Sequence, residues 1–109
     1  MDKNFRWVKL ADGTEELFLG KNNIASVNVE GQKICIVRTL KGLKACSSIC
    51  PHASGDLSGG YLDKKENIVC PVHGYRFSLN HGRDTFNEGF FLKIFRIKES
   101  DDGIFVGLE

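Results

Sequence analysis

Short apolar runs recur along this chain, and several of them alternate apolar with polar positions. Val, Ile, Phe and Leu dominate the runs, and alternation with a period of two is typical of β-strands that bury one face. Asp12–Leu19 is the one segment where we expect a helical turn. We predict strands over Phe5–Leu10, Ile24–Val29, Lys33–Thr39, Leu43–Cys46, Ile68–Cys70, Tyr75–Leu79, Phe90–Lys98 and Gly103–Leu108.

Turn signals separate these runs. Glu30-Gly31-Gln32, Lys41-Gly42 and Asp101-Asp102-Gly103 have the composition of hairpin turns. Frequent short strands without a long helical period predict an all-β fold, an antiparallel β sandwich or small barrel. A chain of 109 residues has room for one hydrophobic core, so we expect a single domain over residues 1–109.

The composition is that of a soluble globular chain, with 41% apolar and 27% charged residues and a net charge of +1. Acidic and basic residues are interleaved, so we expect neither nucleic acid nor a membrane as a partner. The segment Met1–Trp7 lacks the apolar core of a secretory signal, and no later run is long enough to span a bilayer. We therefore expect a cytoplasmic location, where four cysteines favour metal or redox chemistry over disulfides.

Two breaks interrupt the strand pattern. Residues 47–62 are rich in Ser, Gly, Pro and Cys, and Pro71–Gly74 is a second, shorter break within residues 70–75. Long loops inside a compact domain tend to carry function. We therefore take residues 47–62 and 70–75 as the two loops that form the functional site.

Each break contains a cysteine followed closely by a histidine. The motifs are Cys50-Pro51-His52 and Cys70-Pro71-Val72-His73, with seventeen residues between His52 and Cys70. Two thiolates and two imidazoles make a complete set of four metal ligands. Both prolines of the chain directly follow one of these cysteines, and proline stiffens a loop and removes an N–H. We predict that Cys50, His52, Cys70 and His73 bind one metal centre.

The combined pattern, C-x-H followed by C-x-x-H, resembles the signature of the Rieske family. Leu57-Ser58-Gly59-Gly60 and Gly74-Tyr75-Arg76-Phe77-Ser78-Leu79 also resemble that family, and the likeness extends over Phe5–Leu108. The resemblance implies a Rieske-like antiparallel β fold with two cluster-binding loops. It also implies one two-iron, two-sulfur (2Fe-2S) cluster per chain.

By this resemblance, Cys50 and Cys70 would hold one iron, while His52 and His73 would hold the other with their rings at the surface. Two neutral imidazoles in place of two thiolates remove two negative charges from the surroundings of the cluster. The cluster then accepts an electron more readily than an all-cysteine cluster does.

We expect a small Rieske-type ferredoxin that carries electrons and is not itself an enzyme. By resemblance, it passes single electrons from a flavin-containing reductase to a multicomponent, ring-hydroxylating oxygenase. With two of three histidines assigned to the cluster, only His81 remains, so a triad of two histidines and a carboxylate for oxygen activation cannot be built. The chain also lacks a G-x-G-x-x-G segment for binding a nicotinamide or flavin.

Two alternatives stay open at the level of sequence. The small Rieske subunit of an NAD(P)H nitrite reductase is similar in size and motif, and its partner would be the large subunit of that enzyme. A structural Cys2His2 zinc module uses the same ligand types. Zinc sites usually separate their first two ligands by at least two residues, whereas a single residue separates Cys50 from His52.

Other reactive or bulky residues fit structural roles. Cys35 and Cys46 lie in predicted strands, where free cysteines are usually small buried hydrophobes rather than ligands or a redox pair. His81 lies in a predicted turn, and Asp63–Glu66 has the pattern of a solvated hairpin tip. We assign four phenylalanines in predicted strands to the core: Phe90, Phe91, Phe95 and Phe105.

The resemblance also predicts a low reduction potential. High-potential members of the family carry an extra cysteine in each cluster loop, joined as a disulfide, and the matching positions here are Gly55 and Val72. Those members also place a serine and a tyrosine after the second histidine, where this chain has Tyr75 and Phe77. Hydroxyl donors to sulfur favour the reduced state, so their loss lowers the potential.

Overall fold

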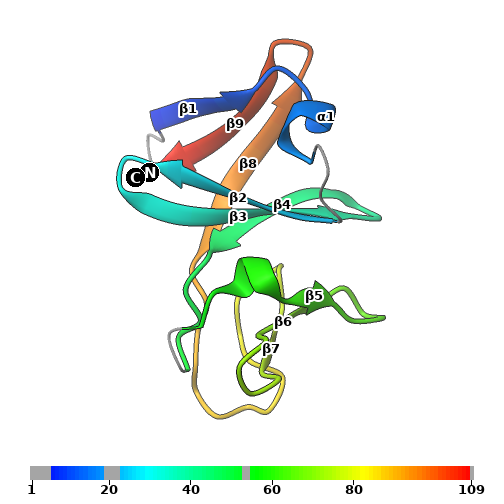
Figure 1. Ribbon diagram of the computed structural model, residues 1–109, viewed down its shortest axis with the longest axis vertical. Helices are drawn as coiled ribbons and strands as arrows, with labels where there is room; N and C mark the ends of the chain where they lie inside the picture. The colour runs from blue at the N-terminus through cyan, green and yellow to red at the C-terminus, as the bar shows by residue number, and fades with distance from the viewer. Residues whose placement is uncertain (1–5, 19–22, 53–54, 109) are drawn as a thin grey trace, which may run out of the picture.

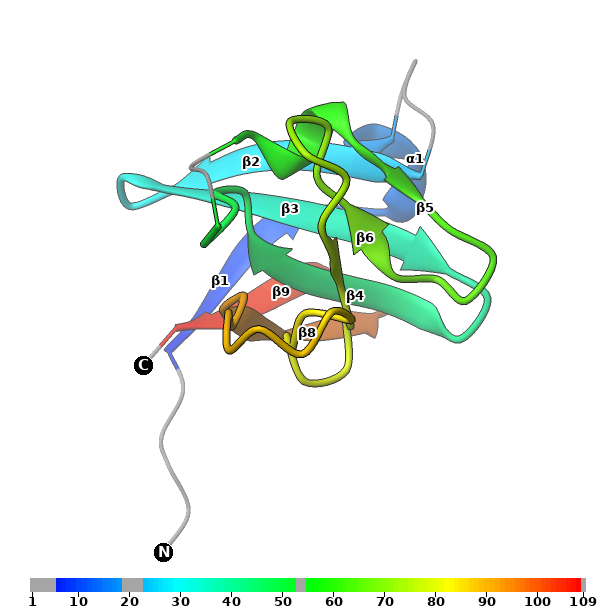
Figure 2. The ribbon, with the colours of Figure 1, turned by 90° about the horizontal axis from the view of Figure 1, so that it is seen from below.

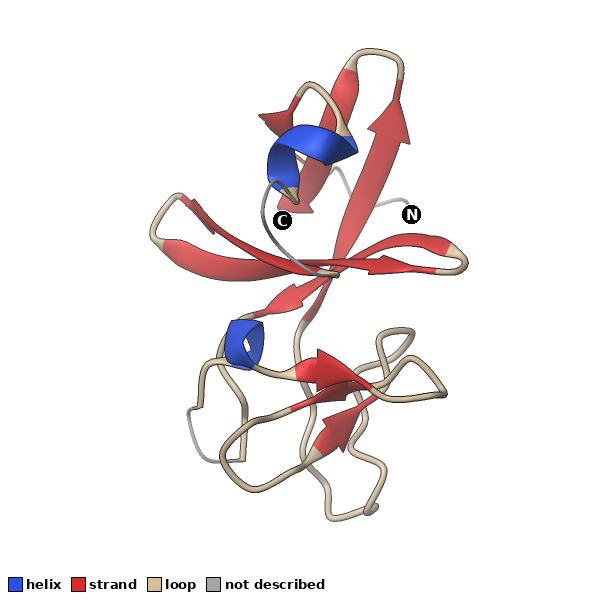
Figure 3. Ribbon diagram, turned by 45° about the vertical axis from the view of Figure 1, so that its right-hand side comes forward, coloured by secondary structure: helices blue, strands red, loops and turns tan. Residues whose placement is uncertain are grey.

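The computed structural model describes residues 6–18, 23–52 and 55–108. Phe5 and the end of the predicted helical segment Asp12–Leu19 lie outside the described residues. Figure 1 shows a larger sheet above a smaller part that consists mainly of loops, and Figure 3 shows the same division by secondary structure. Among the described residues, no helix is both long enough and apolar enough to cross a membrane.

The larger sheet is antiparallel and has six strands in the order β1-β9-β8-β4-β3-β2. A one-turn helix, α1 (Thr14–Leu17), lies between β1 and β2 in the chain. The strands are β1 (Arg6–Ala11), β2 (Ile24–Val29), β3 (Gln32–Thr39), β4 (Gly42–Ser47), β8 (Ile94–Ser100) and β9 (Gly103–Leu108).

The smaller sheet has three short antiparallel strands in the order β5-β6-β7. A 3-10 turn, η1, precedes it. These elements are η1 (Leu57–Gly59), β5 (Tyr61–Leu62), β6 (Ile68–Val69) and β7 (Arg76–Phe77). In Figure 2, this part lies in front of β3 and β4, which confirms the predicted all-β architecture in two layers.

Hairpin turns join the long strands at the predicted places. Val29 pairs with Gln32, Thr39 with Gly42 and Ser100 with Gly103, which leaves a two-residue turn in each hairpin. In the first turn, Glu30 and Gly31 both have positive φ angles, 52° and 83°. This is the backbone of a type I′ turn, whose twist matches that of the strands that it connects.

The chain around Phe90 departs from the prediction. The strand expected over Phe90–Lys98 begins only at Ile94, and Phe91 is 59% exposed instead of lying in the core. The buried carboxylate of Asp84 accepts hydrogen bonds from the backbone N–H groups of Glu88 and Phe90. These bonds close residues 84–90 into a loop and prevent an extended strand there. The strand predicted over Tyr75–Leu79 is also shorter than expected, because only β7 is extended there.

Strand β3 separates two hydrophobic cores. Ile34 and Ile36 belong to the core enclosed by the six-stranded sheet, together with Phe95. Cys35 and Val37, on the opposite face of the same strand, belong to the core between this sheet and the smaller one. Figure 1 shows β3 and β4 in this central position. Of the other predicted core phenylalanines, Phe90 and Phe105 are half-buried.

Candidate metal centre

The first ligand loop connects β4 to η1 and contains Cys50 and His52. The N–H of Cys50 donates to the carbonyl of Gly55 (2.8 Å), and the N–H of Leu57 donates to the carbonyl of Ser48 (2.7 Å). The side chain of Cys50 is buried, whereas His52 is half-buried. The loop therefore directs its cysteine inward and brings its histidine toward the surface.

The second ligand loop is the tight turn between β6 and β7. The N–H of Cys70 donates to the carbonyl of Tyr75 (2.8 Å), and the N–H of Gly74 donates to the carbonyl of Cys70 (3.0 Å). Gly74 has a φ of 74°, a conformation that glycine adopts without steric cost. Cys70 is buried and His73 is exposed, which repeats the arrangement of the first loop.

The structure brings the four predicted site residues together. The imidazole rings of His52 and His73 lie 5.2 Å apart between centroids, at an angle of 79°. Cys50 and Cys70 share the core between the two sheets. The loops meet at Gly55, where an added Cβ would lie only 3.0 Å from the Cys70 sulfur.

The surroundings of these residues fit an iron–sulfur cluster. Among the described residues, Nδ1 of His52 is buried and has no hydrogen-bond partner. Leaving such a group unsatisfied costs about 1–3 kcal/mol, and a metal bond would satisfy it. No three His, Cys, Asp or Glu side chains of the described chain converge as ligands of one ion. A single zinc ion needs such convergence, whereas a 2Fe-2S cluster takes only two protein ligands per iron.

Aromatic rings cover His52, a contact that the sequence analysis missed. The Tyr75 ring stacks on the imidazole at 3.7 Å between centroids and 17° between planes, and Phe90 meets it edge-on at 5.2 Å. The Tyr75 hydroxyl donates to Oε1 of Glu88 (2.8 Å). This hydrogen bond and partial burial raise the pKa of Tyr75, so the hydroxyl keeps its proton.

Asp56 ties the first ligand loop to the sheet. Its Oδ1 accepts from the hydroxyls of Ser48 and Ser58, each at 2.7 Å, and its Oδ2 lies 2.9 Å from Nζ of Lys33. Partial burial alone would raise the pKa of Asp56, but these donors outweigh it and hold the pKa well below its usual range. The carboxylate therefore stays charged and links the loop to β3 and to Ser48, the residue that follows β4.

The remaining cysteines have the structural role expected for them. Cys35 and Cys46 face each other across β3 and β4 and are fully buried. The Cys35 thiol donates to the Ser48 hydroxyl (3.4 Å). Contact with Cys35, together with burial, raises the pKa of Cys46, so this group stays a thiol. Both residues lie within strands, outside the two ligand loops.

The predicted surface features are largely confirmed. His81 is exposed, and its Nδ1 accepts from the N–H of Arg83 (3.2 Å) within a turn. Asp63–Glu66 forms the tip between β5 and β6, as expected. Asp63, however, is more than a solvated charge, because its side chain is only 14% exposed and pairs with Arg76 (2.9 Å).

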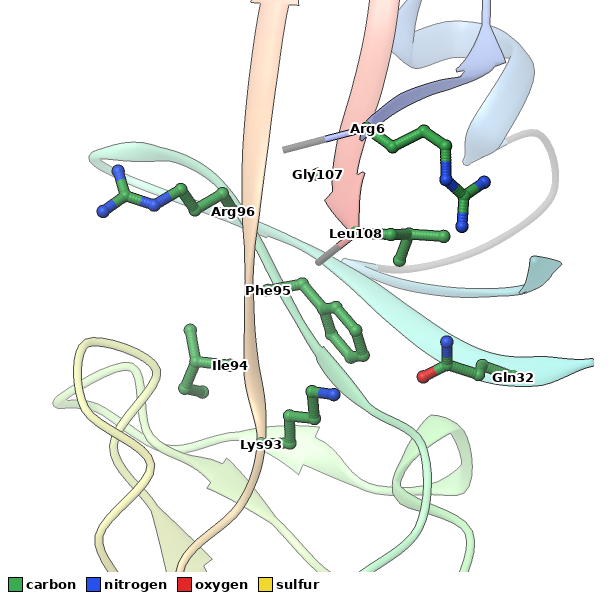
Figure 4. A pocket seen from close by; sticks show the side chains of 8 residues that line it. All are labelled: Arg6, Gln32, Lys93, Ile94, Phe95, Arg96, Gly107 and Leu108. Carbon is green, nitrogen blue, oxygen red and sulfur yellow. The ribbon is translucent and has the colours of Figure 1, made fainter. Parts of the chain in front are cut away.

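A separate pocket lies beside β8 and β9, as Figure 4 shows. None of its lining residues belongs to either ligand loop. Arg6 pairs with Glu30, and the Lys93 ammonium lies over the ring of Phe95. The residues lining this pocket are Arg6, Gln32, Lys93, Ile94, Phe95, Arg96, Gly107 and Leu108.

A two-layered β fold that presents two Cys–His loops side by side defines an iron–sulfur electron-transfer domain. The chain belongs to the Rieske [2Fe-2S] domain family, whose sequence model matches residues 6–87. Membership implies one 2Fe-2S cluster per chain, and the unpartnered Nδ1 of His52 agrees with this. The family assignment therefore favours a 2Fe-2S cluster over the structural zinc module that the sequence left open.

Relatives of the chain include both enzymes and carriers. The cholesterol 7-desaturase nvd of Bombyx mori is 29% identical over 92% of this chain, which spans only 23% of that protein. The ferredoxin component of the naphthalene 1,2-dioxygenase system of Pseudomonas putida is 32% identical over 58% of this chain and 60% of that protein. The chain thus spans less than a quarter of the desaturase relative.

Two solved structures share the fold over nearly their whole length. The ferredoxin of carbazole 1,9a-dioxygenase from Nocardioides aromaticivorans IC177 superposes with a TM-score of 0.80 at 24% identity, covering 94% of this chain and 98% of that one. A protein described as the small subunit of an NADH-dependent nitrite reductase from Mycobacterium tuberculosis gives a TM-score of 0.83 at 16% identity, covering 98% of both chains. At these identities, the likeness establishes the fold.

Proposed function

We propose that Cys50, His52, Cys70 and His73 hold the 2Fe-2S cluster, and that the protein carries single electrons between protein partners. The observation that carries this proposal is the opposite placement of the two ligand types. Both cysteines are buried in the core, while His73 is exposed and His52 is half-buried with an unpartnered Nδ1. Ligands arranged in this way would bring one side of the cluster to the protein surface.

The cluster supplies one-electron chemistry when it is bound. Buried Cys50 and Cys70 exclude water from one side of the site, where a low dielectric strengthens the interactions of their sulfurs. Exposed His73 shortens the distance between the site and a docked partner. Val72 beside it is 49% exposed, which offers a small apolar contact suited to a brief encounter.

As partners we propose a flavin-containing reductase as the donor and a multicomponent, ring-hydroxylating oxygenase as the acceptor. Two findings support this choice: the relative named as a ferredoxin component of a dioxygenase system, and the fold shared along nearly all of the carbazole dioxygenase ferredoxin. We propose that residues 1–109 form one Rieske domain. A carrier role without catalysis fits the single histidine, His81, that lies outside the two motifs.

The small subunit of a nitrite reductase is the second candidate. The fold shared with the protein described as such a subunit, over 98% of both chains, favours it. A subunit would copurify with a large partner chain, whereas a shuttle would purify alone. The expected cytoplasmic location stays a prediction under either role.

In the experiment, the purified protein is mixed rapidly with a reductase or with an acceptor protein. The visible absorption of the cluster then measures the rates of its reduction and reoxidation. We expect a flavin-containing reductase to reduce the cluster and an oxygenase component to reoxidise it within the turnover time of the system. Reoxidation only by the large subunit of a nitrite reductase would establish the second candidate. A protein without the absorption bands of an iron–sulfur cluster would overturn both.

A further inference from the structure

The two histidines of the site have different surroundings. His73 is exposed. Among the described residues, the only aromatic ring in contact with it is that of His52, which meets it edge-on with the centroids 5.2 Å apart. His52, in contrast, has the Tyr75 ring parallel to its face at 3.7 Å and the Phe90 ring against it at 81°. One imidazole is thus enclosed by aromatic rings, while the other is open to a partner.

Tyr75 is itself fixed from several directions. Its hydroxyl donates to Oε1 of Glu88 (2.8 Å), which lies thirteen residues further along the chain. The rings of Phe86 and Phe90 meet it edge-on, with centroids at 5.1 Å and 5.7 Å. Its backbone carbonyl accepts from the N–H of Cys70, so the backbone at Tyr75 is fixed to the second ligand loop.

The three residues around Tyr75 come from one loop, residues 84–90, which we call the Asp84 loop. Asp84 is only 3% exposed, and its two carboxylate oxygens accept from the N–H groups of Glu88 (3.0 Å) and Phe90 (2.8 Å). The N–H of Thr85 donates to the carbonyl of Arg76 in β7 (2.9 Å). The loop is therefore closed by its own carboxylate and is tied to the strand that follows the second ligand loop.

We propose that Tyr75 is a positioning residue for His52 and that the Asp84 loop, through Glu88, holds Tyr75 in place. This proposal rests on the proposed ligation of the cluster by His52. A ring stacked on one face and met edge-on by Phe90 has little freedom to rotate about its bond to the metal. The arrangement keeps the ligand geometry similar before and after electron transfer, and leaves His73 as the ligand that faces the partner.

The test compares four variants at Tyr75 and Glu88, and one control variant, with the unmodified protein, all as the full chain. Tyr75→Leu removes the stacked ring, and Tyr75→Phe keeps the ring but removes the hydrogen bond. Glu88→Ala removes the acceptor, whereas Glu88→Gln retains a carbonyl oxygen for the Tyr75 hydroxyl. Phe91→Leu is the matched control, because Phe91 is an exposed aromatic that contacts Arg83 instead of the site.

Two readouts need no partner protein. Linewidths in the electron paramagnetic resonance spectrum of the reduced cluster report the spread of ligand geometries. The rate of electron self-exchange between oxidised and reduced molecules, measured by nuclear magnetic resonance, reports the cost of rearranging the ligands. We expect broader lines and about tenfold slower exchange in Tyr75→Leu, equivalent to about 1.4 kcal/mol of activation free energy. Tyr75→Phe and Glu88→Ala should show smaller changes in the same direction, Glu88→Gln less still, and Phe91→Leu none.

Unchanged linewidths and exchange rates in Tyr75→Leu would overturn the proposal. If Tyr75→Leu fails to retain the cluster, Tyr75→Phe and Glu88→Ala decide, because both keep the Tyr75 site filled by a ring; unchanged values in both would overturn it. A change of equal size in Phe91→Leu would also overturn it. Absence of a cluster signal from the unmodified protein would instead overturn the proposed function on which the proposal rests.

Discussion

Gly55 of the first ligand loop lies directly against Val72 of the second. A Cβ added to Gly55 would lie 2.5 Å from Cγ2 of Val72, so the loops are in contact there without a side chain on one partner. By family resemblance, these two positions carry a disulfide in high-potential Rieske proteins. Their contact in this structure supports the matching of positions, and here neither residue is a cysteine.

We therefore expect a reduction potential near the lower end of the Rieske range, about −150 mV and not above about 0 mV. The Tyr75 hydroxyl donates to Glu88 instead of to sulfur, and Phe77 is fully buried and has no hydroxyl. The site thus lacks two donors that would favour the reduced state. Protein-film voltammetry at neutral pH measures the potential, and a clearly positive value would contradict this reading of the two loops.

The four proposed ligands should each be required for the cluster. Cys70→Ser should abolish the visible absorption, because Cys70 is buried where the two loops meet and neither loop holds a cysteine besides Cys50 and Cys70 that could take its place. Cys35→Ala is the control and should keep the absorption, since Cys35 is buried in β3 opposite Cys46. Iron content and the visible spectrum measure both. A full cluster in Cys70→Ser would refute the ligand assignment.

Electron exit at the exposed histidine predicts a local effect at Val72. Val72→Glu should slow electron transfer to a competent partner by about tenfold or more while leaving the spectrum intact, because it places a charge in the apolar contact. Leu40→Glu is the matched control: Leu40 is 94% exposed in the turn between β3 and β4. Rapid mixing with the partner measures the rate. Equal rates for Val72→Glu and the unmodified protein would place the docking face elsewhere.

Asp56 should make stability depend on pH. Its pKa is lowered in the folded protein, so its contribution is complete above the pKa of the unfolded chain, about 3.9, and is lost as the pH falls toward the folded value. Asp56→Asn should therefore unfold at lower denaturant concentration at pH 7, with a difference that narrows below about pH 4. Circular dichroism across pH 3–7 measures this.

Asp101→Asn serves as the comparison for Asp56→Asn, because Asp101 is exposed in the turn between β8 and β9. A difference between Asp56→Asn and the unmodified protein that stays constant across this pH range would show that the carboxylate charge is not what stabilises the loop.

Much of the architecture is predictable because its signals are local. The hairpins around Glu30-Gly31 and Asp101-Asp102 follow from turn residues between alternating strands, and both lie where the sequence places them. The four proposed ligands could be predicted from the sequence because each Cys–His pair is contained in a few consecutive residues. Their position side by side agrees with that pattern.

The ring over His52 was not predictable in the same way. Tyr75 and Glu88 are thirteen residues apart, and their contact depends on the loop closed by Asp84. Nothing in the local composition distinguishes Asp84 from a solvated aspartate. For the same reason, Phe91 was assigned to a core strand, although the loop turns it to the surface at 59% exposure.

The division of the interior by β3 has a consequence for how the protein is assembled in the cell. Ile34 and Ile36 complete a core that involves neither ligand loop, whereas Cys35 and Val37 belong to the core that also contains Cys50 and Cys70. The six-stranded sheet needs β8 and β9 from the end of the chain, but its core contains none of the four proposed ligands, so we expect the complete chain to form this sheet before it binds the cluster. In this order of maturation, the part of the protein that carries the two ligand loops completes its packing when the cluster is delivered.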